Sequence, residues 1–194
     1  TLTGRALKPA DDSLPYVIKN ILVPINAQKG DELPVSAFKG MEDGTMPLGT
    51  SKYEKRGIAT HLPVWDAAEC LQCNMCSFVC PHAVIRPFLL DEGEVKAAPV
   101  DMTLVDAKGP GLAGLKYTMG VSTLDCTSCG SCVASCPKSG KALKMVPAHE
   151  VSLDQTDWNF LTTVKEKTSR VDKFTLKGSQ FKQPLVEFNG ACAG

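Results

Sequence analysis

The sequence has few aromatic residues, no excess charge of either sign and no long apolar run. Aromatic side chains make up only 6% of its 194 residues, so large core-forming side chains are scarce. Its 21 Lys and Arg balance 21 Asp and Glu, which is not the basic excess typical of nucleic-acid binding. No stretch approaches the roughly 20 apolar residues that a membrane-spanning helix needs. We therefore expect neither a nucleic acid nor a membrane as a partner.

The first residues also lack the apolar segment of a secretory signal, because TLTGRALKPADD leads into no such run. We therefore expect a cytoplasmic location, where the reducing environment keeps thiols unpaired. The nine cysteines of the chain are then better explained as metal ligands than as disulfides.

Eight of the nine cysteines fall into two runs of identical spacing. Both runs follow C-x2-C-x2-C-x3-C-P, and neighbouring residues repeat with them, which indicates an internal duplication. The first run is Cys70, Cys73, Cys76 and Cys80, followed by Pro81, and the second is Cys126, Cys129, Cys132 and Cys136, followed by Pro137.

This spacing is typical of proteins that bind two [4Fe-4S] clusters. Three cysteines at steps of three can reach adjacent corners of a cubane cluster, while the cysteine before proline ligates the cluster of the other run. The motif therefore predicts two interlocked sites. Cluster 1 is assigned to Cys70, Cys73, Cys76 and Cys136, and cluster 2 to Cys126, Cys129, Cys132 and Cys80.

Other interpretations of these residues stay open. Zinc also binds four cysteines, although its structural sites usually combine two C-x2-C pairs across a longer span. Disulfides fit poorly with an odd number of cysteines. His82, directly after Pro81, either donates toward the nearby cluster or is an ordinary exposed residue. We expect no catalytic side chain, because no hydroxyl residue has a neighbouring base in the sequence.

The cysteine runs mark the expected folded part of the chain. A minimal domain spans 63–147, with an insertion at 88–122 that forms a hairpin, a loop over the clusters or a solvated loop. Proline after each fourth cysteine predicts short helices over 81–85 and 137–144. Residues 1–62 and 148–194 show no sustained helical period, so we expect extended arms, the second leading to a domain outside this sequence.

The fold class predicted from these features is α+β. It combines a ferredoxin-like two-[4Fe-4S] domain, built with a pseudo-two-fold duplication, with largely extended, loop-rich arms.

Four stretches carry a more specific resemblance. They are VIKNILVPINAQKGDELPVSAF (17–38), EDGTMPLGTSKYEKRGIA (42–59), VWDAAECLQCNMCSFVCPHAVIRPFLL (64–90) and DKFTLKGSQFKQPLVEFNGACAG (172–194). Together they resemble the internal ferredoxin-type segment of single-chain pyruvate:ferredoxin oxidoreductase, also called pyruvate synthase. The flanking stretches distinguish this family from other proteins better than the cysteine runs do, because such runs fit many ferredoxins.

The resemblance implies a role in electron transfer rather than carbon chemistry. Enzymes of this family convert pyruvate and coenzyme A to acetyl-CoA and CO2 on thiamine diphosphate with Mg2+. They pass single electrons through three [4Fe-4S] clusters to an external ferredoxin or flavodoxin. This segment would carry the two outer clusters, and the remaining domains of a homodimeric parent enzyme would hold thiamine diphosphate, Mg2+ and the third cluster.

Cys192 is the ninth cysteine and lies outside both runs. The resemblance matches it to a ligand of the third cluster. Too few other cysteines remain to complete such a site, so in this chain alone Cys192 is better explained as a free thiol near the terminus.

Two other functions compete with this interpretation: an independent two-cluster ferredoxin, and an iron-sulfur subunit of another redox complex or 2-oxo acid oxidoreductase. Residues 63–147 contain seven basic and eight acidic residues. A diffusing carrier is expected to show a stronger field of one sign. The near-neutral balance therefore favours a module fixed inside a larger enzyme.

Overall fold

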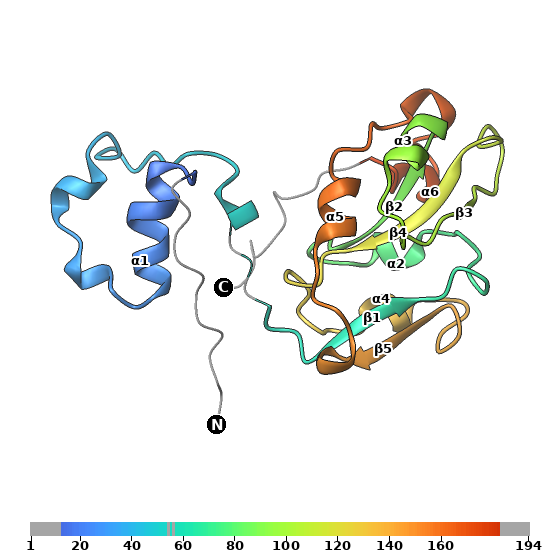
Figure 1. Cartoon of the computed structure of the whole chain (residues 1–194), viewed down its shortest axis with the longest axis horizontal. Helices are drawn as coiled ribbons and strands as arrows, with labels where there is room; N and C mark the ends of the chain where they lie inside the picture. The colour runs from blue at the N-terminus through green and yellow to red at the C-terminus, as the bar shows by residue number, and fades with distance from the viewer. Residues whose placement is uncertain (1–12, 54, 56, 183–194) are drawn as a thin grey trace. The chain divides into compact units, whose positions relative to one another are not determined.

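The computed structural model describes residues 13–53, 55 and 57–182 (Figure 1). The chain divides into two compact units, unit 1 within residues 1–53 and unit 2 within residues 54–194. Short helices and antiparallel strands both occur, in agreement with the α+β class. Among the described residues, no helix combines the length and apolar character needed to cross a membrane.

Unit 1 is a small helical body, whereas we expected residues 1–62 to be extended. Its elements are the π-helix η1 (Ile18–Leu22), α1 (Val23–Asn26) and the 3₁₀ turns η2 (Gly30–Glu32), η3 (Val35–Phe38) and η4 (Thr50–Tyr53). Ile18 and Ile21 are buried one turn apart, and Pro24 is tolerated because it lies in the first turn of α1. The expectation was wrong for these residues because η1 and α1 follow one another as a single helical stretch that is too short to give a sustained period.

Unit 2 is built on two antiparallel sheets. The first pairs β1 (His61–Trp65) with β5 (Leu143–Pro147). The second has the order β2-β4-β3 and is formed by β2 (Ile85–Leu90), β3 (Val105–Asp106) and β4 (Lys116–Val121). Because β1 starts at His61, unit 2 begins before the boundary predicted at residue 63.

The short helices near the cysteines precede each Cys-Pro pair. They are α2 (Met75–Phe78) and α4 (Ser131–Ala134), which contact each other (Figure 1). The helices predicted over 81–85 and 137–144 are wrong. Turns and irregular backbone follow each Cys-Pro pair, and strands then begin at Ile85, which pairs with Val121, and at Leu143, which pairs with Trp65.

The insertion at 88–122 supplies most of the second sheet and is no solvated loop. All six residues of β2 are buried, since alternate side chains face opposite sides of the strand. Ile85 and Leu89 pack in the core beside the cysteines, while Phe88 and Leu90 pack against a helix on the other face. Of the structures considered for the insertion, the hairpin is the one found: β3 and β4 are its consecutive antiparallel strands, and β2 pairs with the other edge of β4.

Residues 148–182 are packed within unit 2 instead of forming an extended arm. Their elements are η5 (Ala148–Glu150), α5 (Thr156–Leu161), η6 (Thr168–Arg170) and α6 (Leu176–Ser179). Trp158 and Leu161 of α5 are buried against the second sheet. Lys167 forms a 2.7 Å ion pair with Glu94 of α3 (Glu92–Ala97). No local sequence pattern records these long-range contacts. The sequence therefore predicts an extended arm where the structure has packed helices.

Candidate metal centre

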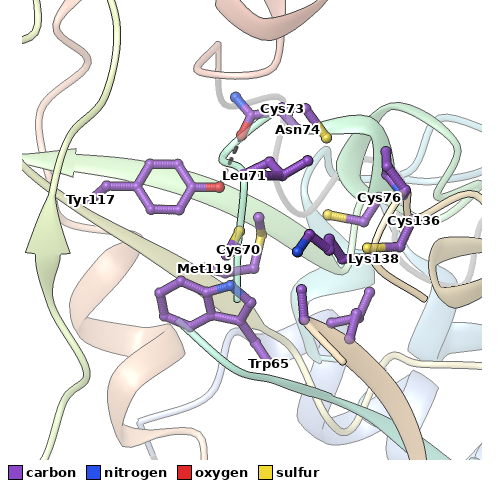
Figure 2. A pocket seen from close by; sticks show the side chains of 13 residues that line it. Trp65, Cys70, Leu71, Cys73, Asn74, Cys76, Tyr117, Met119, Cys136 and Lys138 are labelled. Carbon is purple, nitrogen blue, oxygen red and sulfur yellow. Dashed lines mark hydrogen bonds between the residues drawn. The ribbon is translucent and has the colours of Figure 1, made fainter. Parts of the chain in front are cut away.

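The first cysteine loop and one residue of the second run line a common pocket, here called pocket A (Figure 2). Cys70, Cys73 and Cys76 come from the loop that leads into α2, and Cys136 follows α4. The cavity measures about 380 Å³ including its open mouth. Pocket A therefore gathers the four cysteines assigned to cluster 1.

A second pocket, pocket B, has the reciprocal composition. It is lined by Cys126, Cys129 and Cys132, and by Cys80 from the first run. Its volume, about 340 Å³ including the mouth, is close to that of pocket A. The two pockets thus divide the eight cysteines in the way predicted for two interlocked clusters, while the bonds to iron stay a prediction.

The two cysteine loops repeat the same backbone conformations. Gln72 and Ser128 both have positive φ, 54° and 63°, and each donates its backbone N–H to the sulfur of the cysteine two residues earlier, at 3.3 and 3.4 Å. Asn74 and Gly130, at φ 63° and 74°, both precede a short helix. A left-handed backbone is uncommon outside glycine, so Gln72, Asn74 and Ser128 need support from their surroundings.

Buried amide side chains supply that support in the first loop. Gln72 is 1% exposed; it donates to the carbonyl of Asp106 at 2.8 Å and accepts from the N–H of Lys108 at 2.8 Å. Asn74 donates to the carbonyl of Lys177 at 2.9 Å and accepts from the hydroxyl of Tyr117 at 2.9 Å (Figure 2). These roles were missed from the sequence, because the partners lie 34 to 103 residues away.

The second loop is fixed by a buried carboxylate. The Asp125 side chain is 1% exposed, pairs with the Lys55 ammonium and accepts from the Ser122 hydroxyl. Ser128 further accepts from the backbone N–H of His61 at 3.0 Å. Asp125 directly precedes Cys126, so this ion pair links a residue outside the predicted 63–147 domain to the start of the second run.

Three thiols of the pockets, those of Cys76, Cys126 and Cys132, resist ionisation on their own. Burial raises the pKa of Cys76 to about 12 and that of Cys132 to about 11, and neighbouring cysteines add to both increases. Burial also raises the pKa of Cys126, whereas hydrogen bonds from Ser131 lower the pKa of the exposed Cys129. Because thiolates are the metal ligands, the thiols of Cys76, Cys126 and Cys132 need a positive centre beside them to ionise.

The arrangement of the thiols fits a cubane cluster. The eight cysteines of the two runs are all free of disulfides. A tetrahedral zinc site needs four sulfurs at about 2.3 Å from one ion, whereas a cubane spreads four thiolates over four irons. Each pocket brings four thiols from two separate segments around a common cavity, which is the kind of ligand set that a cubane needs.

The other residues singled out in the sequence have different outcomes. His82 lines pocket B with Cys80 and Pro81, so it lies near the cysteines, and its role toward a cluster stays a prediction. Cys192 lies outside the described residues.

Comparison with known proteins agrees with this geometry. A family model described as a 4Fe-4S dicluster domain matches residues 69–143, and a second one, EKR, described as a domain of unknown function, matches residues 5–59. A pyruvate-flavodoxin oxidoreductase of Enterobacter agglomerans is 51% identical over 185 residues, which cover 93% of this chain and 15% of that protein.

A pyruvate:ferredoxin oxidoreductase of Moorella thermoacetica is also 51% identical, over 181 residues that cover 93% of this chain and 15% of that protein. The chain resembles the ferredoxin-type segment of pyruvate:ferredoxin oxidoreductase. The resemblance stated from the sequence is thereby confirmed.

A third relative of this ferredoxin-type segment is a pyruvate dehydrogenase [NADP(+)] of Cryptosporidium parvum, with 49% identity over 188 residues, 96% of this chain and 10% of that protein. The segment thus spans about 15% or less of the length of these relatives.

Proposed function

We propose that this chain holds two [4Fe-4S] clusters and carries single electrons between them. The proposed ligands are Cys70, Cys73, Cys76 and Cys136 for cluster 1, and Cys126, Cys129, Cys132 and Cys80 for cluster 2. The observation that carries the proposal is the composition of the two pockets, each combining three cysteines of one run with the fourth of the other.

Bound clusters would supply one-electron oxidation and reduction. The chain's own contribution is to hold the ligands and keep water away from them. Ile85, Tyr117 and Leu143 belong to a buried core against which Cys76, Cys80 and Cys136 pack. We propose that the matching backbone of the two loops reflects a pseudo-two-fold duplication, with 63–147 as its centre and the flanking residues as additions to it.

We further propose that the chain is part of a longer 2-oxo acid oxidoreductase that oxidatively decarboxylates pyruvate to acetyl-CoA and CO2. Support comes from relatives named for pyruvate oxidation with flavodoxin or ferredoxin. Thiamine diphosphate, Mg2+ and a third [4Fe-4S] cluster would then belong to the remaining domains, with Cys192 as a conditional ligand of the third. The external acceptor would be ferredoxin or flavodoxin, and the parent enzyme a cytoplasmic homodimer.

Metal analysis tests the core of this proposal. Anaerobically prepared chain is expected to contain about eight iron and eight sulfide per polypeptide, with EPR signals of two spin-coupled clusters after reduction. About two zinc ions per chain and no sulfide would contradict it.

Paired substitutions test the crossed ligands. Cys80→Ser should remove the same EPR signal as Cys129→Ser, because both residues are assigned to cluster 2. Cys136→Ser should instead remove the EPR signal that Cys73→Ser removes, because both residues are assigned to cluster 1. If Cys80→Ser resembles Cys73→Ser, each run would ligate its own cluster and the interlocked assignment would be wrong.

A further inference from the structure

One polar group in pocket A has no partner inside the protein. Among the described residues, two buried side-chain nitrogens lack a hydrogen bond, Nε1 of Trp65 and Nε of Arg86. The Arg86 guanidinium is otherwise held, since its other nitrogens donate to Gln180 at 3.0 and 2.9 Å. The indole of Trp65 has only this one polar atom, and a buried tryptophan N–H usually finds an acceptor.

Trp65 is fixed at the edge of the cysteine pocket. It ends β1 opposite Leu143 of β5, and its ring lies 6.0 Å from that of Tyr117 between centroids. Trp65, Leu143 and Tyr117 all line pocket A together with its four cysteines. Figure 2 shows the ring edge that carries the nitrogen turned toward the pocket, on the side of Cys70.

A sulfur acceptor would satisfy this donor. The hydroxyl of Tyr117 is already used, because it donates to Asn74. The pocket is otherwise lined mainly by apolar atoms of Leu71, Met119 and Leu143, which offer the indole no strong acceptor. A [4Fe-4S] cluster bound by the four cysteines brings thiolate and sulfide sulfurs into the same cavity, and N–H donors to such sulfurs stabilise the more negative, reduced cluster.

We propose that the indole N–H of Trp65 donates a hydrogen bond to a sulfur of cluster 1 and raises the reduction potential of that cluster. The inference rests on the proposed function, since it requires cluster 1 to be bound in pocket A.

The second half of the duplication lacks this donor. Trp65 lies five residues before Cys70, and the residue five before Cys126 is Val121. Both side chains pack at the periphery of the same core. Valine carries no side-chain donor. The tryptophan therefore acts on one cluster and makes the two sites electronically unequal.

Two phenylalanine substitutions test the proposal in the full 194-residue chain. Trp65→Phe removes the N–H and keeps an aromatic ring, while Trp158→Phe is the matched control. Trp158 is a buried residue of α5 that packs against Phe88, and it lines neither cysteine pocket. In EPR-monitored redox titrations, we expect Trp65→Phe to move one of the two couples to a more negative potential and leave the other in place. Trp158→Phe should move neither. Two unchanged couples in an iron-replete Trp65→Phe variant would overturn the proposal.

A measurement on the unsubstituted chain covers the case in which Trp65→Phe does not bind its clusters. Tryptophan labelled with ¹⁵N at the indole should give a weak nitrogen coupling in the ENDOR spectrum of one reduced cluster, and this coupling should persist in Trp158→Phe. Its absence from fully loaded, labelled chain would refute the hydrogen bond. If the unsubstituted chain contains no clusters at all, the proposed function fails instead, so iron and sulfide analysis separates the two outcomes.

Discussion

Single buried side chains hold the cysteine loops in conformations that their own backbones disfavour. Asn74 is 1% exposed with φ 63°, and its amide joins the first loop to α6 and to β4 through Lys177 and Tyr117. An amide with both ends satisfied can fix such a loop, whereas an unsatisfied buried one would destabilise it.

Tyr117→Phe is therefore expected to destabilise unit 2. It leaves the Asn74 side-chain oxygen without its buried donor, at a cost of about 1 to 3 kcal/mol. Denaturant unfolding and the rate of iron release to a chelator measure the effect. Tyr16→Phe is the matched control, because the mostly exposed Tyr16 makes a longer bond of 3.4 Å to the carbonyl of Ala37. Equal free energies of unfolding for both variants would show that the Tyr117 hydroxyl contributes little.

At the level of elements, the second sheet separates the cysteine pockets from α5. Gly120 is the second-last residue of β4 and lies opposite Arg86 of β2. A Cβ placed there would come within 2.7 Å of the Leu161 methyl and 3.0 Å of the Phe88 ring. Both neighbours are almost fully buried and have little room to move. The glycine thus allows α5 to pack closely on the sheet.

Gly120→Ala is expected to lower the free energy of unfolding by about 1 to 3 kcal/mol, because the added methyl overpacks this contact. Gly93→Ala serves as the control, since Gly93 lies in α3 and its Cβ would meet only Asp91 at 3.4 Å. Alanine favours a helix over glycine by roughly 0.5 to 1 kcal/mol. The two substitutions should therefore change the free energy of unfolding in opposite directions. Chemical denaturation of both variants checks this, and a neutral Gly120→Ala would mean that α5 is free to shift.

On the scale of the whole molecule, the metal centre and the core of unit 2 are continuous. Cys132 belongs to the same buried cluster as Ile85 and Tyr117, and Cys76, Cys80 and Cys136 pack against it. With aromatics at only 6% of the residues, the clusters would organise much of this unit.

Removal of iron is therefore expected to lower the thermal midpoint of unit 2 by about 10 °C or more. Both tryptophans of the chain, Trp65 and Trp158, lie in unit 2, so tryptophan fluorescence reports on it selectively. Anaerobic chelation followed by a thermal scan provides the measurement, and reconstitution with iron and sulfide is the control. An unchanged midpoint would show that unit 2 is stable without clusters.

The sequence by itself determined the number of cysteine runs and their spacing, and it predicted which thiols line each pocket together. It could do so because the ligands of a cubane are set by local spacing plus one crossed residue. It placed the short helices wrongly, because the pairing of Ile85 with Val121 and of Leu143 with Trp65 is decided between segments far apart in the chain. Only the tertiary structure decided the roles of Gln72, Asn74, Lys55 and Trp65, since each depends on a partner or a cavity that no local pattern records.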